Sequence, residues 1–158
     1  VQAGHSTGWG CVDGATHTFN AMLGITHRGM STALSALIHD EVYAEIIGDG
    51  VHVSDDALKL FFKAKPEDKV ILISDALPIT YSDMKETVFA DSKIYYDGDK
   101  ATSDDGTIAG STKLLPEIIK ILGKKGMFKP RFIENTYRYH GLEPMGEIEW
   151  DEDFNPRF

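Results

Sequence analysis

The 158 residues include 25 acidic and 16 basic side chains, for a formal net charge of −9, and 42% of them are hydrophobic. This composition is typical of a globular chain with one real core. It disfavours nucleic acid and anionic membranes as partners, because both bind basic surfaces. The longest apolar runs, such as 70–73, are too short to cross a bilayer. A lone Cys11 and no visible signal peptide favour a reducing, cytoplasmic location.

The first half of the chain predicts one strand–helix–strand unit. Residues 1–30 are rich in Gly, His, Thr and Asn and predict loops, whereas 31–40 predict a short helix or turn. The alternation over 42–47 predicts a strand. The apolar stripe over 55–65 predicts a helix capped by Ser54 or Asp55. The β-branched run over 69–74 then predicts a strand buried on both faces of a parallel sheet.

The second half is less regular. Short strands are expected at 87–89 and 93–96, with Asp-Gly turns between the strands of this region. A helix is expected over 111–123, with Pro116 in its first turn or at its true start and Gly123 at its end. The tail from 127 to 158, with its prolines and acidic patch, has no clear assignment.

Four polar side chains lie at the ends of expected strands or in the loops that follow: His5, His17, His52 and Asp75. In parallel α/β folds reactive groups collect there, because the strand fixes the residue and the loop exposes it. Neutral imidazoles are good zinc ligands, and a nearby carboxylate can hold or deprotonate a bound water. These residues suggest a metal-dependent hydrolytic site.

The residues alone also allow ordinary structural roles. The spacing of His5 and His17 is no recognised metal-binding pattern, so on the residues alone loop histidines explain both better than metal ligands do. His52 fits a satisfied core histidine, and Asp75 fits a helix cap or turn former. Arg28 fits a surface cation, and Ser111 fits a plain helix N-cap.

Six motifs in a fixed order favour functional roles for these residues over the ordinary structural ones. They are Gly4-His5-Ser6, Thr16-His-Thr-Phe-Asn-Ala-Met22, His27-Arg28, Asp49-Gly-Val-His-Val53, Ser74-Asp-Ala76 and Gly106-Thr-Ile-Ala-Gly-Ser-Thr112. The series resembles the N-acetylglucosamine-6-phosphate deacetylases of the amidohydrolase superfamily, from about residue 4 to 123. The resemblance implies an α/β fold: residues 1–126 would form about strands five to eight of a (β/α)8 barrel. Residues 127–158 would form a tail returning toward a small β domain.

The resemblance also implies roles for particular residues. His5 and His17 would bind a divalent metal ion, with zinc favoured over iron, manganese or cobalt, and Asp75 would activate the metal-bound water and later protonate the leaving amine. The remaining roles concern the amino-sugar phosphate: Asn20, Ala21, Arg28, His52, Ala109, Gly110 and Ser111 would bind it. Arg28 would do so in the site of a neighbouring subunit, which implies a homodimer.

The implied reaction removes acetate from N-acetylglucosamine 6-phosphate, a step of amino-sugar metabolism. Three departures from the family pattern accompany it. A glutamate metal ligand and a histidine expected upstream are absent, His5 and His17 lie unusually close, and the loop after Asp75 is short. We expect sequence upstream of Val1, and no activity if the chain is this short. Another amidohydrolase, acting on a cyclic amide or an amine, and an inactive fragment are the alternatives.

Overall fold

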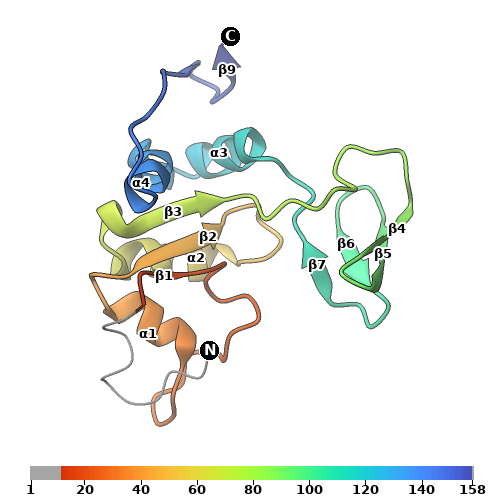
Figure 1. Cartoon of the computed structure of the whole chain (residues 1–158), viewed down its shortest axis with the longest axis horizontal. Coiled ribbons are helices and arrows are strands. Elements are labelled where there is room, and N and C mark those ends of the chain that lie inside the picture. Colours follow the sequence, from red (N-terminus) through yellow and green to blue (C-terminus); the bar gives the residue numbers. More distant parts are fainter. Residues whose placement is uncertain (1–11, 158) are drawn as a thin grey trace.

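The computed structural model describes residues 12–157, and its centre is a three-stranded parallel sheet in the order β1-β2-β3. The strands are β1 (Gly14–Ala15), β2 (Tyr43–Ile47) and β3 (Val70–Ile73). Ala44 pairs with Val70 and Ile47 with Ile73, so β3 pairs with β2 over its whole length. All three strands point the same way, and their carboxyl ends therefore share one edge of the sheet (Figure 1).

Short helices connect these strands, as the sequence predicted. Helix α1 (Thr32–Ile38) begins after Ser31, whose hydroxyl accepts from the amide of Leu34 at 3.0 Å. Helix α2 (Asp55–Ala64) begins after Ser54, whose hydroxyl accepts from Ala57, and two acidic residues in its first turn complement the helix dipole. A single 3-10 turn, η2 (Glu67–Lys69), follows Pro66 and leads into β3. The predicted β2–α2–β3 unit is confirmed.

Two further helices follow. Helix α3 (Leu115–Lys124) has Pro116 in its first turn, as predicted, but it starts four residues later than position 111. The delay has a physical reason: the backbone of Ser111 is bonded to Asp75 and Leu77 at the end of β3 and is not available to a helix. Helix α4 (Arg131–Tyr139) lies in the tail that the sequence left unassigned. The predicted end at Gly123 is one residue early, and the positive φ falls at Gly126 instead.

The main core lies between one face of this sheet and the helices. Ala44, Ile46, Val70 and Leu72 point into it from the strands. They meet apolar side chains from all four helices, among them Leu37, Phe61, Leu122 and Phe132. Full burial of side chains of this size stabilises the fold by about 1.5–3 kcal/mol each.

Two polar side chains brace this core from within. The amide nitrogen of Asn135 donates to the carbonyls of Glu67 and Val70 at 2.8 Å each, which ties α4 to the start of β3. The ammonium of Lys65 donates to the carbonyls of Ala36 and His39 and so closes the end of α1. Burial lowers the pKa of Lys65 because it penalises the charged form.

A four-stranded antiparallel sheet forms a second lobe after β3 (Figure 1). Its strands are β4 (Glu86–Phe89), β5 (Ser92–Tyr96), β6 (Ala101–Ser103) and β7 (Ile108–Gly110). Ile94 and Ala101 pack with Leu77 and Ile79 in a small core of their own. The two strands predicted here are confirmed, and β6 and β7 were not foreseen.

The end of the chain forms a small hairpin of β8 (Glu149–Trp150) and β9 (Pro156–Arg157). Asp151 Oδ1 accepts from the amides of Asp153 and Asn155 at 2.9 Å and builds the turn. Phe154 packs over Gly123 of α3, where any side chain would collide with its ring. This two-stranded piece agrees with a tail that returns toward a small β domain.

The complete barrel and the domain boundary at residue 126 stay predictions. The described residues supply three parallel strands with their helices, and α4 shares their core although it lies beyond that boundary. None of the helices within residues 12–157 combines the length and apolarity needed to cross a membrane.

Candidate active site

The parallel strands bring the predicted catalytic residues to one edge of the sheet. His17 lies two residues after β1, Asp49 and His52 follow β2, and Asp75 lies two residues after β3. Adjacent strands are about 4.8 Å apart, and β2 lies between the strands that carry His17 and Asp75. The carboxyl-terminal edge of a parallel sheet is where enzymes of this architecture place their chemistry. His5, the other predicted metal ligand, lies outside the described residues.

The turn after β1 holds His17 in an unusual backbone conformation. His17, Phe19 and Ala21 have φ of 36°, 81° and 52°, a region that side chains other than glycine rarely adopt. The amide of Asn20 donates to the carbonyl of His17 at 2.9 Å and closes the turn. Glu45 of β2 holds the turn to the sheet, since its carbonyl accepts from the amide of Thr18 at 2.8 Å. Such strain is typical of functional sites.

One ring nitrogen of His17 contacts the backbone of its own turn. Its Nδ1 lies 3.1 Å from the carbonyl oxygen of Asn20. A metal-binding histidine usually donates one ring N–H to a carbonyl, which leaves the other nitrogen for the metal. Within residues 12–157 no three His, Cys, Asp or Glu side chains form a metal-binding cluster. The role of His17 as a metal ligand therefore stays a prediction.

His52 is tied to a buried carboxylate that the sequence analysis did not assign. Its Nδ1 lies 2.8 Å from Asp49 Oδ2, and the side chains are 6% and 2% exposed. Asp49 Oδ1 accepts from the amides of Val51 and His52 at 2.9 Å. Burial alone would raise the pKa of Asp49, but the hydrogen bonds from His52 and these amides outweigh it and hold the pKa well below its usual range. Asp49 is therefore a carboxylate.

Asp75 and the predicted substrate loop are joined by backbone pairing. The amide of Ser111 donates to the carbonyl of Asp75, and the amide of Leu77 donates to the carbonyl of Ser111, both at 2.9 Å. Asp75 has a φ of 50°, and its side chain is exposed. Gly110 has no room for a side chain, because a Cβ would lie 3.1 Å from the Asp75 carbonyl and 2.8 Å from Leu77. Ala109, Gly110 and Ser111 thus run directly beside the predicted catalytic residue.

The side chain of Ser111 connects this loop to the histidine. Its hydroxyl lies 2.9 Å from Asp49 Oδ2, the oxygen that also faces His52. Three of the predicted site residues, His52, Asp75 and Ser111, are therefore linked through Asp49 and one backbone pairing. Neither ordinary alternative for Asp75 and Ser111 as helix caps holds, because no helix follows Asp75 directly and α3 begins after Leu114.

The structure does not bring every predicted residue to this network. Asn20 and Ala21 lie in the turn after β1, and Ala21 is exposed. Arg28 is exposed in the loop before α1, and no hydrogen bond within the described part of the chain joins it to the other site residues. Its predicted role across a subunit boundary is untested.

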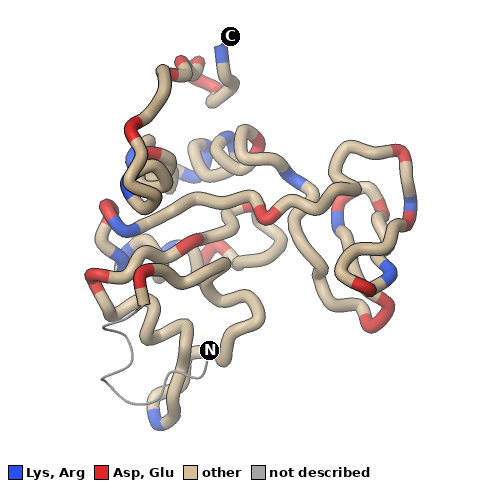
Figure 2. The backbone as a smooth tube through the Cα atoms, in the orientation of Figure 1, with Lys and Arg blue, Asp and Glu red and all other residues tan. Residues whose placement is uncertain are grey.

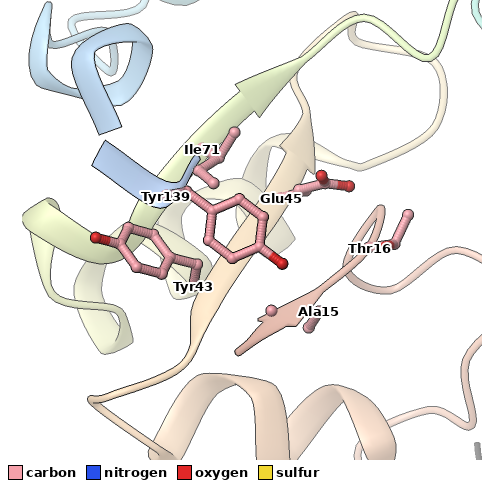
Figure 3. A pocket seen from close by; sticks show the side chains of 7 residues that line it. Ala15, Thr16, Tyr43, Glu45, Ile71 and Tyr139 are labelled. Carbon is pink, nitrogen blue, oxygen red and sulfur yellow. The ribbon is translucent and has the colours of Figure 1, made fainter. Parts of the chain in front are cut away.

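A separate small cavity lies over the opposite face of the sheet (Figure 3). It has a volume of about 20 Å³, room for roughly one water, and is lined by Gly14, Ala15, Thr16, Tyr43, Glu45, Ile71 and Tyr139. Acidic residues are spread over both lobes, with several at the turns of the β4–β7 sheet (Figure 2). The cavity is too small for a sugar phosphate, and the acidic residues supply none of the positive charge that its phosphate requires.

Comparison with known proteins identifies relatives of the chain. No protein-family model matches the chain. The chain is 39% identical over 98 residues to the N-acetylglucosamine-6-phosphate deacetylase of Bacillus subtilis, covering 61% of this chain and 24% of that protein. It is 32% identical over 98 residues to an N-acetylgalactosamine-6-phosphate deacetylase of Shewanella, covering 62% of this chain and 25% of that protein.

Solved structures extend the match. The crystal structure of the N-acetylglucosamine-6-phosphate deacetylase of Thermotoga maritima superposes with a TM-score of 0.82 at 25% identity, over 91% of this chain and 44% of that one. The enzyme of Pasteurella multocida shows the same fold, with a TM-score of 0.78 at 24% identity over 91% of this chain and 42% of that one. The chain's homologues are N-acetylglucosamine-6-phosphate deacetylases.

The resemblance read from the motifs is therefore confirmed, and the chain matches the C-terminal portion of these deacetylases. It spans about a quarter of the length of the curated deacetylases it matches. Asp49 is the site residue that the sequence analysis missed. Its signal was present, because an aspartate followed by Gly-Val-His after a strand is the pattern of a turn in which the carboxylate faces the third residue on.

Proposed function

We propose that the protein containing this chain removes the acetyl group from N-acetylglucosamine 6-phosphate and releases glucosamine 6-phosphate and acetate. One observation carries the proposal: His17, His52 and Asp75 follow three neighbouring parallel strands, in a chain whose relatives are deacetylases of this kind. An amino-sugar phosphate is a small anion. A local cation such as Arg28 is enough to bind it, although the net charge of the chain is negative.

Asp75 is the proposed acid–base group. Its exposed carboxylate takes a proton from the attacking water as the water oxygen bonds to the amide carbon. The same proton then passes to the amide nitrogen as the C–N bond breaks, because an amine leaves poorly unless it is protonated. Acetate and an ammonium group result, because the proton left on the product acid also ends on the amine, and Asp75 returns to its ionised form. The positive φ at Asp75 is consistent with a residue held for this task.

The remaining residues position the substrate. Asn20, Ala21 and Arg28 are the proposed contacts of the phosphate and sugar, and His52 faces a sugar hydroxyl. Ala109, Gly110 and Ser111 line the acetamide side, next to Asp75. Binding energy from the remote phosphate helps to hold the amide in place for attack.

A divalent metal ion is part of the proposal, with zinc favoured and iron, manganese or cobalt as alternatives. His17 would hold it through the ring nitrogen opposite the Asn20 contact, together with His5. Such an ion would supply Lewis-acid activation of the water and the amide carbonyl. A cytoplasmic homodimer in which Arg28 reaches the partner's site belongs to the same proposal.

N-acetylgalactosamine 6-phosphate is a second candidate substrate, since two relatives, 32% and 28% identical to the chain, are deacetylases of that sugar. The test supplies the full-length protein with Zn²⁺ and measures acetate release from each of the two sugar phosphates and ring opening of a cyclic amide. Acetate from either sugar phosphate supports the proposal, and the ratio of kcat/KM names the preferred sugar. Turnover of the cyclic amide alone, or of none of the three, would overturn it.

A further inference from the structure

We infer that Asp49 is a positioning residue that sets the proton on the ring of His52, so that His52 presents a hydrogen-bond acceptor to the substrate. The inference rests on the proposed function for the substrate and goes beyond it, because Asp49 is not among the expected site residues. It starts from one contact, the 2.8 Å separation of His52 Nδ1 and Asp49 Oδ2.

The state of Asp49 fixes the direction of that hydrogen bond. Its pKa lies well below the usual range, so the carboxylate is ionised and can only accept. The facing Nδ1 must therefore carry the hydrogen. A neutral imidazole has one N–H, so Nε2 is left with a free lone pair. A sugar hydroxyl can donate a hydrogen bond to that lone pair. In the opposite tautomer Nε2 would carry the hydrogen and would itself donate to the sugar hydroxyl.

The backbone fixes the geometry as firmly as the charge does. Asp49 Oδ1 accepts from the amides of Val51 and His52 at 2.9 Å, so the carboxylate cannot rotate away without breaking both bonds. The side chain of Asp49 is only 2% exposed, so bulk solvent has little access to Oδ2. The ring of His52 is thus oriented by a rigid and desolvated acceptor.

Ser111 makes Asp49 a shared anchor. The Ser111 hydroxyl donates to the same Oδ2 at 2.9 Å, while the Ser111 amide is bonded to the carbonyl of Asp75. One carboxylate therefore holds both the histidine after β2 and the loop that lies beside Asp75. A change at Asp49 affects two sides of the substrate pocket at once.

The test is to observe the ring nitrogens of His52 directly. In the full-length protein labelled with ¹⁵N-histidine, a two-bond ¹H–¹⁵N spectrum at about pH 8 shows which nitrogen carries the hydrogen. We expect Nδ1–H in the wild type. In Asp49→Asn the amide group can keep accepting from the backbone while its nitrogen faces the ring and donates, so we expect the Nε2–H form. The wild-type spectrum decides the tautomer even if the variant does not fold.

The kinetic readout uses N-acetylglucosamine 6-phosphate. Asp49→Asn should raise KM about tenfold, the size of one lost hydrogen bond of about 1.4 kcal/mol, and change kcat less than about threefold. The matched control is Asp97→Asn, since Asp97 Oδ1 also accepts from the amides two and three residues on, in an exposed turn without a histidine. Ser111→Ala should keep the tautomer of His52.

Each outcome has a distinct meaning. An Nε2–H ring in the wild type, or an unchanged tautomer in Asp49→Asn, overturns the inference even in an active enzyme. An inverted tautomer with unchanged KM shows that His52 does not accept from the substrate, which also overturns it. A wild-type protein that neither binds nor hydrolyses the sugar phosphate refutes the proposed function and the substrate contact, whereas the spectrum still reports on the Asp49–His52 pair.

Discussion

Ser111 and Asp49 lie 62 residues apart in the chain, yet the hydroxyl of one donates to the carboxylate of the other at 2.9 Å in a buried position. This bond joins the loop after β7 to the loop after β2. Because the backbone of Ser111 also pairs with Asp75, the loops that follow β2, β3 and β7 are held together at one edge of the parallel sheet. The candidate site is built from these loops rather than from any single motif.

Loss of the carboxylate at Asp75 should damage turnover. We expect Asp75→Asn to lower kcat for N-acetylglucosamine 6-phosphate by at least about 100-fold, the usual scale of lost acid–base help, and to retain the bound metal. Steady-state acetate release and metal content measure the two effects. Asp97→Asn, at an exposed turn, is the control and should keep wild-type turnover. An Asp75→Asn variant with normal kcat would remove this residue from the mechanism.

Removal of the imidazole at position 17 should weaken metal binding. His17→Ala loses one ligand, and we expect the Zn²⁺ affinity to fall by at least about 100-fold. Loss of a residue that only hydrogen-bonds to a ligand typically lowers metal affinity by about 10–100-fold. Competition with a chromogenic chelator measures the affinity without any assay of activity. The control is His27→Ala, an exposed histidine in the following loop. Equal affinities of the two variants would contradict a role for His17 in metal binding.

Acid should destabilise the protein through Asp49. The pKa of this carboxyl is lowered in the folded state, so the folded chain takes up a proton less readily than the unfolded chain, where the pKa is about 3.9. Its contribution is therefore complete above about pH 4 and is lost as the pH falls toward the folded value. Each pH unit in that window costs about 1.4 kcal/mol.

Urea unfolding of the wild type and of Asp49→Asn between about pH 2.5 and 7 measures this contribution. The difference in unfolding free energy between the two proteins should be largest near neutral pH and should shrink on acidification below about pH 4. A difference that stays constant over the whole range would show that Asp49 titrates normally in the folded protein.

Space beside Asp75 is limited by Gly110. An alanine Cβ at this position would lie 2.8 Å from Leu77 and 3.1 Å from the carbonyl of Asp75, so Gly110→Ala should destabilise the fold by about 1–3 kcal/mol, as overpacking does. It should also lower kcat/KM, because the loop that carries Ser111 must shift. Gly24→Ala is the matched control, since nothing lies within 4 Å of its Cβ. Thermal unfolding and kinetics of both variants compare the effects.

The ammonium of Lys65 should contribute to the stability of the fold through its hydrogen bonds as well as its charge. Lys65→Met removes the ammonium that donates to the carbonyls of Ala36 and His39, of which the second keeps the amide of Val42, and we expect a loss of about 1–3 kcal/mol in unfolding free energy. Lys63→Met, at an exposed position in α2, should change stability by less than about 0.5 kcal/mol. Equal effects would show that the two carbonyls find other partners.

The sequence predicted the local elements of the first half well because their signals are local. Ser54 caps α2, and the apolar run over 70–73 forms β3, as their immediate neighbours dictate. The start of α3 could not be predicted in this way, because Ser111 is held by Asp75 and Asp49 from distant parts of the chain. Helix α4 was missed since its polar sequence is stabilised by tertiary contacts of Phe132 and Asn135.

The residues of the candidate site likewise fall into those with a local sequence signal and those whose contacts come from distant parts of the chain. The motifs located His17, His52 and Asp75 correctly at strand ends, since the β2–α2–β3 pattern and the strand-to-loop transitions are visible in the sequence. Asp49 was overlooked because its role comes from its contacts with His52 and Ser111. Of these two residues only His52 is near Asp49 in sequence. The positive φ values at His17 and Asp75 have no sequence signature, because neither residue is a glycine.

The docking of α4 has a consequence for biosynthesis. Its last residue, Tyr139, packs against Tyr43 and lies where Gly14 leaves room for its hydroxyl, so nearly the first and nearly the last described parts of the core touch. Residues up to about Tyr139 must therefore leave the ribosome before α4 can cover its part of β1 and β2. Until then the nascent sheet presents apolar side chains that attract chaperones or other unfinished chains.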